Sequence, residues 1–429
     1  MDAEFNAPSR WPFVKRIAFR FFFTYFVLYI WPFPVYFIPY SYYVTQPLSE
    51  IFNRVVAKAG PVFLGQNYYH NPAMNGSGDT SHQYAQVFLL LIISSIITLI
   101  WSVLDRRRQI YSKLYGGLNI YVRYYLAATL LSYGFMKVFP VQFSTPPLSR
   151  LSQTYGESSP MGLLWTFMGY SAPYTIFTGV GETLAGTLLL FRRTRLLGAL
   201  LSALIMVHVF VLNMSYDVPV KLLSFHLLVM SIFLIGPDFK RLVNLFVLNK
   251  TAPPQVPDLV ITDIRLKWMA GLVKAGIIYV IFFSQLFFAI ESRKSVDEVV
   301  ASNSENETTG EFSVTHFLIN GDTLPPISRD TRRWKAVLFN GNTMQIKSMD
   351  GFAINWHCAI RNGIHKVKMY STDFSTYGEF DFEKEGDILV LKGILNQDSL
   401  HVVSRRISTN SVPLLARGFH WISESPFNR

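Results

Sequence analysis

The pattern of hydrophobic and polar positions changes near residue 311. Before that point, apolar runs of about 20 residues recur between shorter polar stretches, whereas after it short runs alternate apolar and polar positions. About 20 apolar residues in a helix cross the roughly 30 Å hydrocarbon layer of a bilayer, and strict alternation is typical of half-buried strands. The pattern therefore predicts a polytopic α-helical membrane protein followed by a small all-β domain outside the membrane.

Seven apolar runs are predicted to span the membrane. They lie near 18–39, 85–104, 120–139, 171–191, 196–214, 218–236 and 269–290. The first run contains Arg20 and is not followed by a small-residue cleavage site, so we interpret it as an uncleaved anchor. Short loops join the four runs between 120 and 236, which predicts an antiparallel four-helix bundle.

The same pattern divides the chain into five parts. These are a two-span region with an outer loop at 40–84 (1–110), a four-helix core (111–245), a cytoplasmic loop with the seventh span (246–292), a polar, flexible linker (293–310) and the β-domain (311–429). Runs such as "TMQIKSM" and "ILVLKGIL", with hairpin signals such as "FNGNTM" and "KEGDIL", predict about eight strands. Consecutive strands of this kind form a barrel or a sandwich, and we expect a lipocalin-like barrel.

The basic residues give an orientation. Every second connecting segment is basic ("SRWPFVKR", "DRRRQIYSK", "RRTR", "DFKR"), as the positive-inside rule requires of cytoplasmic segments. The N-terminus is therefore expected in the cytoplasm and, after seven spans, the β-domain in the periplasm of a bacterial inner membrane. The net charge of +11 lies wholly before residue 292, so it reflects topology and lipid contact and gives no reason to expect a nucleic-acid partner.

Ionisable residues interrupt four consecutive apolar runs. From the orientation, Lys137, Glu182, His208, Lys221 and His226 all fall in the outer half of the bilayer. A charge at the bilayer centre costs from about 2.5 kcal/mol upward, so such groups normally pair or face a bundle interior. We therefore expect the glutamate to pair with one of the two lysines, and the histidines to exchange protons near neutral pH. The resulting site is a polar pocket that opens outward.

The positions of these ionisable residues suggest a role for each of them, and for several a second role is possible. The candidate catalytic residues are Glu182, His208 and His226, and the candidate ligand-binding residues are Lys137, Lys221 and Arg123. Either lysine can instead reach the outer headgroups, the arginine can anchor the cytoplasmic interface, and His208 can be a packing residue. Lys221 and His226 lie about 140° apart on a helix, so at least one of them has another role.

Other chemistry has little support in the residues. Nothing in the sequence has metal-ligand spacing or a nucleotide-binding motif. Asp79 and His82 of the outer loop could contact a ligand, but a solvated turn is the simpler interpretation. Gly179, Gly181 and Gly186, beside the buried acid, would let another helix or a ligand approach closely.

The core resembles a known family. "RYYLAATLLSYGFMKVFP" and "GVGETLAGTLLLF" resemble the DoxX-like membrane proteins, whose pattern places Arg123, Gly134, Lys137, Glu182 and Gly186. The resemblance covers roughly 120–240. The layout of two preceding spans, "GSGDT" in an outer loop, "GPDFKRLVNLFVLN" and a terminal β-domain is similar to the DoxX-like proteins of Bacteroidetes.

The resemblance implies a redox-linked function with a quinone or quinol as the small partner, because some relatives are subunits of thiosulfate:quinone oxidoreductase. The chain would then be a subunit of a quinone-linked oxidoreductase. Its lone cysteine, Cys358, lies in the β-domain, so thiol–sulfur chemistry within the bundle is not supported. Two other hypotheses remain: a non-enzymatic envelope assembly or scaffold protein whose β-domain binds a protein partner, and a transporter or lipid-handling protein with a polar path.

Overall fold

A computed structural model describes residues 10–69, 77–151, 153–251, 263–305, 309–361, 365–371, 376–408 and 412–416. The chain divides into two compact units. The first, mainly helical, comprises Met1–Gln142 and Pro173–Glu291, and the second, which contains the β-domain, comprises Phe143–Ala172 and Ser292–Arg429.

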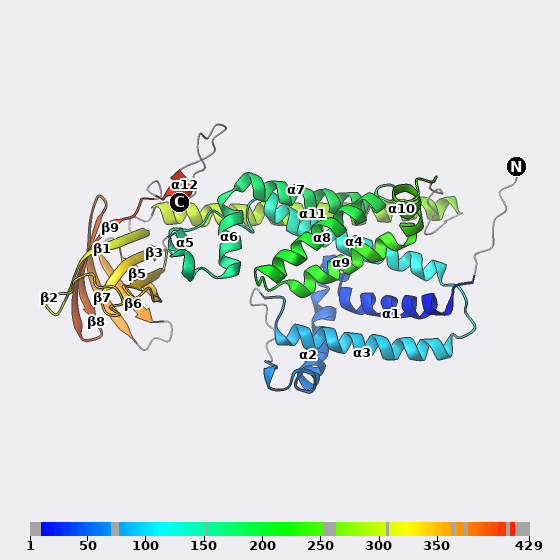
Figure 1. The fold of residues 1–429 in the computed structure, drawn as a ribbon, viewed down its shortest axis with the longest axis horizontal. Helices are drawn as coiled ribbons and strands as arrows, with labels where there is room; N and C mark the ends of the chain where they lie inside the picture. The colour runs from blue at the N-terminus through cyan, green and yellow to red at the C-terminus, as the bar shows by residue number, and fades with distance from the viewer. Residues whose placement is uncertain are drawn as a thin grey trace. The chain divides into compact units, whose positions relative to one another are not determined.

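The first unit is built of helices, and most of the long ones coincide with the apolar runs (Figure 1). They are α1 (Phe13–Ile30), η1 (Val35–Phe37), α2 (Tyr42–Leu64), η2 (Gly65–Asn67), α3 (Ser81–Leu104), α4 (Ser112–Val138), α7 (Ala172–Leu190), α8 (Arg195–Ser215), α9 (Lys221–Ile235), η4 (Gly236–Asp238), α10 (Phe239–Phe246) and most of α11 (Ile264–Glu305). Of the described helices, five are long and apolar enough to cross a membrane: Phe13–Phe37, Ser81–Leu104, Arg195–Ser215, Lys221–Phe246 and Ile264–Ser302. The unit is thus compatible with an integral membrane protein.

The two remaining predicted spans are also helices, α4 and α7, but they are not among those five. Both carry charged or polar residues within their apolar stretches, which lowers their mean hydropathy. The count of seven spans therefore stays a prediction.

One predicted flexible segment is helical instead. The linker is helical as far as Glu305 because α11 continues for 42 residues. A helix of that length is roughly 63 Å long. This expectation was wrong because polar composition was interpreted as flexibility. The outer loop at 40–84 contains the 23-residue helix α2, which the sequence analysis did not predict.

The helices of the predicted core pack in a ring. Helix α8 lies against α9, and α9 against α4. Gly198 of α8 lies against Leu188 and Leu189 of α7, where an added Cβ would come within 2.8 Å of a backbone nitrogen. Helix α7 in turn contacts α4, which closes a four-helix bundle as predicted from the sequence. Helix α1 packs against α3 and α4 outside this ring.

The start of α1 is fixed by a buried arginine. Arg20 donates hydrogen bonds to the hydroxyl of Tyr111 at 2.7 Å, to Oγ of Ser102 at 2.8 Å and to the carbonyl of Asp105 at 3.0 Å. Tyr111 donates to the Asp105 carboxylate at 2.9 Å. The charge that interrupts the first apolar run is therefore satisfied at the end of α3, within the protein.

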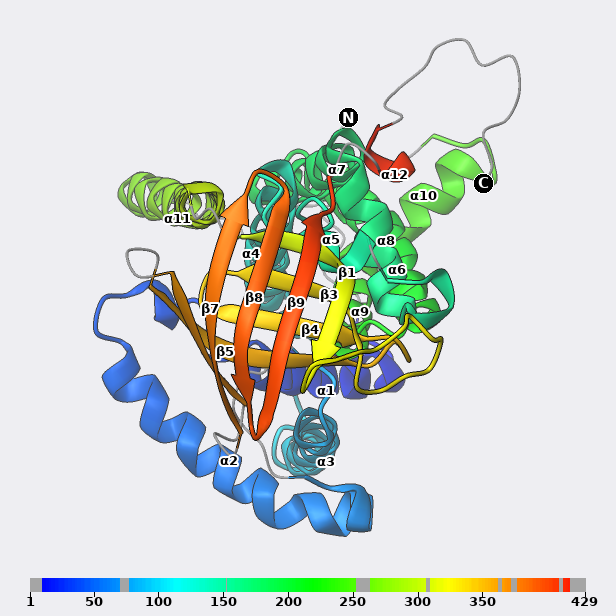
Figure 2. The same cartoon turned by 90° about the vertical axis from the view of Figure 1, so that its left-hand side faces the viewer.

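The second unit contains a closed β-barrel (Figure 2). Its strands are β1 (Gly310–Ile319), β2 (Asp322–Thr323), β3 (Trp334–Asn340), β4 (Thr343–Ser348), β5 (Ala353–Arg361), β6 (Lys366–Ser371), β7 (Tyr377–Glu385), β8 (Ile388–Leu395) and β9 (Asp398–Arg406). From β3 onward each strand pairs antiparallel with the next, β1 pairs with β3, and β1 also pairs with β9, which closes the sheet. The two-residue β2 pairs only with the end of β1. The predicted meander barrel is confirmed, and the sandwich alternative is wrong.

The barrel interior is filled by side chains. Phe312, Phe317, Phe339 and Phe380 are each at most 1% exposed within one continuous apolar cluster. The unit also includes α5 (Leu148–Leu151), η3 (Tyr155–Glu157), α6 (Pro160–Tyr170) and the short α12 (Pro413–Ala416). Alternation along the strands therefore places the large residues inside, as in small barrels without a ligand cavity.

Candidate functional site

Glycines bring α4 and α7 into backbone contact. A Cβ added to Gly134 would lie 2.4 Å from Oγ1 of Thr183 and 2.9 Å from the carbonyl oxygen of Gly179. A Cβ on Gly186 would lie 2.9 Å from Cγ of Leu131 of α4. The close approach predicted for Gly179 and Gly186 is confirmed, whereas the nearest neighbour of Gly181 would be at an ordinary 3.7 Å. Small residues of this kind let apolar helices approach closely.

This approach places Lys137 of α4 against Glu182 of α7. Nζ of Lys137 donates to both carboxylate oxygens of Glu182, at 2.7 and 2.6 Å, and the two side chains are only 10% and 4% exposed. The ammonium also lies 5.8 Å from the centroid of the Tyr133 ring. From the sequence, either Lys137 or Lys221 could pair with Glu182, and in the structure the partner is Lys137.

Next to this ion pair lies the tyrosine pocket, a cavity of about 340 Å³ in the first unit. It is lined by Tyr29, Ile30, Trp31, Pro32, Tyr36, Tyr125, Ala128, Thr129, Ser132, Tyr133 and Gln285. Its walls come from the end of α1, the turn that follows it, α4 and α11. Cavities for small ligands begin at about 300 Å³ and combine apolar walls with a few polar groups.

Polar side chains in the pocket are available to a ligand. Among the described residues, Ser132, the Tyr133 hydroxyl and the Gln285 amide make no hydrogen bond to another side chain or to the backbone. They come from α4 and α11, on different walls of the cavity. The pocket thus offers hydrogen-bonding groups among aromatic rings.

His226 lies behind the pocket wall. Its Nδ1 is 2.6 Å from the carbonyl oxygen of Leu222, and its Nε2 is 2.6 Å from the hydroxyl of Tyr25. Because a carbonyl can only accept, Nδ1 carries a hydrogen, and Nε2 of the neutral ring accepts from the tyrosine. The ring of Tyr29 stacks on the imidazole with centroids 4.0 Å apart. His226 is therefore fully hydrogen-bonded and does not itself line the cavity.

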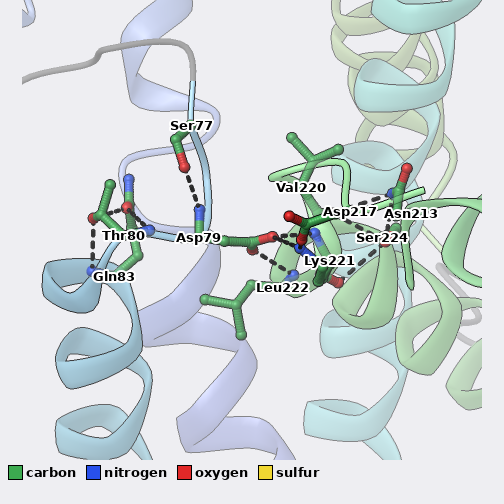
Figure 3. Close-up of polar contacts among 10 residues, drawn as sticks. All are labelled: Ser77, Asp79, Thr80, Gln83, Asn213, Asp217, Val220, Lys221, Leu222 and Ser224. Carbon is green, nitrogen blue, oxygen red and sulfur yellow. Dashed lines mark hydrogen bonds and ion pairs between the residues drawn. The ribbon is translucent and has the colours of Figure 1, made fainter. Parts of the chain in front are cut away.

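Lys221 lies in a different network, at the start of α9 (Figure 3). Its Nζ is 2.8 Å from Asp217 and 3.8 Å from Asp79, so Lys221 is not the partner of Glu182, which was one of the two alternatives that the sequence left open. The Asp79 carboxylate also accepts the backbone N–H groups of Lys221 and Leu222, at 2.7 and 2.9 Å. These two bonds satisfy free donors at the first turn of α9.

The solvated turn proposed for Asp79 is also wrong, because its side chain is only 7% exposed. His82, from the same loop, is 3% exposed and hydrogen-bonds to Tyr68 at 3.1 Å. Both groups from "GSGDTSH" therefore fix the start of α3 within the protein.

The remaining two candidates lie elsewhere. His208 is exposed on α8, outside the pocket lining, because its face of the helix is turned away from the bundle. Arg123 is 5% exposed and lines a cavity of about 10 Å³ with Asn119, Leu189, Arg195 and Leu234. Such a volume holds about one water molecule. The arginine is thus enclosed by the bundle helices and is not exposed on their outer surface.

The six candidate residues therefore do not meet at one point. Lys137 and Glu182 form the ion pair, and His226 is linked to the tyrosine pocket through Tyr29. Sequence reasoning missed the tyrosines, although a signal exists. In α4, Tyr121, Tyr125, Thr129 and Tyr133 recur at every fourth position, which places them along one helix face.

Together, the first unit defines an apolar helical bundle with a buried ion pair and an adjacent polar cavity, and the second a filled barrel. In comparisons with known proteins, no family model and no solved structure matches the chain. The uncharacterized protein YwoB of Bacillus subtilis (strain 168) is 36% identical over 126 residues, which are 29% of this chain and 79% of YwoB. The chain therefore belongs to the family of YwoB.

Proposed function

We propose that this chain is a seven-span protein of a bacterial inner membrane, with a cytoplasmic N-terminus and a periplasmic β-domain. Five apolar helices and the alternation of basic connecting segments support this topology. The α4–α7 contact involves the same glycine, lysine and glutamate positions as the DoxX-like pattern, which supports membership of that family.

We further propose that the tyrosine pocket binds a quinone or quinol. The observation that carries this proposal is a cavity of about 340 Å³ lined by four tyrosines and a tryptophan, with unpaired polar groups of Ser132, Tyr133 and Gln285. Aromatic walls stack against a planar ring, and hydroxyl and amide donors suit ring carbonyl oxygens. The Lys137–Glu182 pair lies behind Tyr133 and adds a fixed dipole beside the cavity.

A redox-linked role then requires electrons from outside the bundle. The single cysteine of the chain belongs to the barrel, where burial raises the pKa of the Cys358 thiol to about 11 and keeps it protonated. A partner protein would therefore exchange electrons with the bound quinone. This chain would bind the quinone ring and form hydrogen bonds to its oxygen atoms. On this proposal the protein is the quinone-binding subunit of an oxidoreductase.

Ligand binding can be measured through Trp31, whose indole lines the pocket. Purified full-length protein in lipid nanodiscs is titrated with a short-chain naphthoquinone, and quenching of tryptophan fluorescence is recorded. We expect saturable quenching that decreases in Trp31→Phe. Extraction of the purified protein with organic solvent, followed by mass spectrometry, shows whether a native quinone co-purifies.

Two matched variants test the polar contacts. Tyr133→Phe removes one hydroxyl from the pocket, and Tyr279→Phe removes one from the exposed face of α11. A lost hydrogen bond of about 0.5–1.5 kcal/mol weakens binding roughly 2- to 12-fold. We expect that loss for Tyr133→Phe and no change for Tyr279→Phe. Equal affinities in both variants and the wild type would exclude the pocket as the site.

A second candidate function is favoured by the filled barrel. Because its interior holds one continuous cluster of apolar side chains, a partner protein would bind to the outside of this domain. The scaffold hypothesis predicts capture of an envelope protein that requires residues 311–429 and persists in Glu182→Gln. Transport or lipid handling, by contrast, predicts uptake into proteoliposomes that the same variant abolishes.

A further inference from the structure

Helix α2 has one face buried against the protein. Val56 and Gly60 are buried, and a Cβ on Gly60 would collide with the ring of Tyr68 at 2.2 Å. Asn53 lies 3.4 Å from His82 at the first turn of α3. Helix α2 is therefore held at the N-terminal end of α3, the end opposite the basic "DRRRQ" segment.

A second face of α2 is apolar and exposed. Its residues are Val44 (62% exposed), Leu48 (48%), Ile51 (58%), Val55 (46%) and Val62 (81%). At 100° per residue, these positions fall within an arc of roughly 60°, so they form one stripe along the helix. The stripe points away from the face that contacts α3. We call it the α2 stripe.

A third face is charged. Glu50, Arg54 and Lys58 recur at every fourth position and are exposed. Around the helix axis, these three residues lie between the α2 stripe and Asn53 of the buried face. Apolar and charged faces side by side, on one short helix, are the signature of a helix that lies in a membrane–water interface.

The orientation of α2 fits that location. Figures 1 and 2 show α2 running crosswise to α3, so that it would lie flat when α3 spans a bilayer. The outward side of α3 is apolar as well, with Phe88, Ile92 and Ile96 between 44% and 50% exposed. The ring of Phe63, near the end of α2, lies 6.3 Å from that of Phe88, so α2 packs beside a surface that faces acyl chains if α3 crosses the membrane.

We propose that α2 is an interfacial helix of the outer leaflet, with the α2 stripe among the acyl chains and Arg54 and Lys58 at lipid phosphates. This inference rests on the membrane embedding proposed above and goes beyond it. It assigns a lipid-binding surface to a segment outside the predicted spans. A phospholipid bilayer is the occupant because α2 packs beside the apolar side of α3 and carries exposed cationic side chains next to the stripe.

Site-directed labelling of full-length protein in phosphatidylcholine liposomes tests the proposal. Single cysteines are introduced as Val55→Cys on the stripe, Glu50→Cys on the charged face and Ile96→Cys on α3, and each is labelled with an environment-sensitive NBD fluorophore. The native thiol is buried with a raised pKa, so the unsubstituted protein gives the background labelling. Quenching is measured with lipids that carry a nitroxide on the acyl chain.

We expect strong quenching and a blue-shifted emission at position 55, and at least threefold weaker quenching at position 50. Position 96 reports on membrane embedding itself. Quenching at 96 together with a water-exposed label at 55 would overturn the α2 proposal alone, whereas water exposure at both positions would overturn the embedding as well. Disulfide-linked dimers formed by the unlabelled Val55→Cys protein on mild oxidation would assign the stripe to a second copy and also overturn the proposal.

Discussion

The buried ion pair gives the sharpest test of the bundle. If Lys137→Met removes the cation, Glu182 remains in an apolar contact between α4 and α7, where it is 3% exposed. An unpaired charge there can be avoided only by protonation. Protonating a glutamate in water at pH 7 costs about 3.7 kcal/mol, and deprotonating a lysine costs about 4.6 kcal/mol. The first value is the upper limit for the free energy of unfolding lost in Lys137→Met, and the second is the upper limit for that lost in Glu182→Gln. Both agree with the 3–5 kcal/mol typical of broken buried pairs.

Both single variants should therefore have a lower free energy of unfolding than the wild type. The free energy of unfolding is measured by denaturant titration in mixed micelles at pH 7.

The double variant Lys137→Met/Glu182→Leu removes both charges and keeps apolar volume. Because nothing is left unpaired, we expect it to lose less stability than either single variant, with a coupling free energy above about 3 kcal/mol. Additive losses, or single variants within about 1 kcal/mol of the wild type, would refute the reasoning. They would mean that both side chains reach water or headgroups.

Three further predictions concern the helix contacts and the barrel. Gly134→Ala should lower the free energy of unfolding by about 1–3 kcal/mol, because its Cβ would clash with Thr183. Gly117→Ala, whose Cβ would have no described atom within 4 Å, should raise it slightly. Thermal unfolding in detergent compares the two variants. Asp79→Ala should lower the free energy of unfolding by about 1–2 kcal/mol, because two N–H groups of α9 lose their acceptor. Asp217→Asn, at the exposed aspartate of the same network, should lower it by less than about 0.5 kcal/mol. Thermal unfolding in detergent measures both. Cys358 should react with maleimide at pH 7.5 only after denaturation, because it is buried and its pKa is raised to about 11; mass spectrometry counts the adduct, and labelling of the folded protein would contradict this.

Much of the helical unit was predictable, because an apolar run of about 20 residues has few alternatives to a helix. Two segments show where that reasoning fails. In α2, apolar positions recur at spacings of three and four among charged residues, which is typical of an amphipathic helix. The search for long apolar runs did not detect this spacing. In the last turns of α11, Glu, Lys, Ala and Val continue a helix started in the apolar run, and polarity was mistaken for flexibility.

The site was predictable in part. A carboxylate inside an apolar run requires a cation, which correctly pointed to a pair at Glu182. The choice between Lys137 and Lys221 depends on helix rotation, and the glycine contact of α4 with α7 fixes that rotation. No pattern in the sequence indicated that His208 faces outward while His226 faces the bundle, because both stand in runs that are apolar on every side.

Tyr133 connects the ion pair with the pocket, since its ring lies 5.8 Å from Nζ of Lys137 and also lines the cavity. The pair therefore has either a structural role alone or an additional role in binding. The double variant Lys137→Met/Glu182→Leu separates these, because it removes the dipole while the fold is retained. If the dipole polarises a bound ring carbonyl, naphthoquinone affinity should fall about 2- to 5-fold in this variant, which corresponds to roughly 0.5–1 kcal/mol. An unchanged affinity in the folded double variant would restrict the pair to holding α4 against α7, and the ligand would then depend on Ser132, Tyr133 and Gln285 alone.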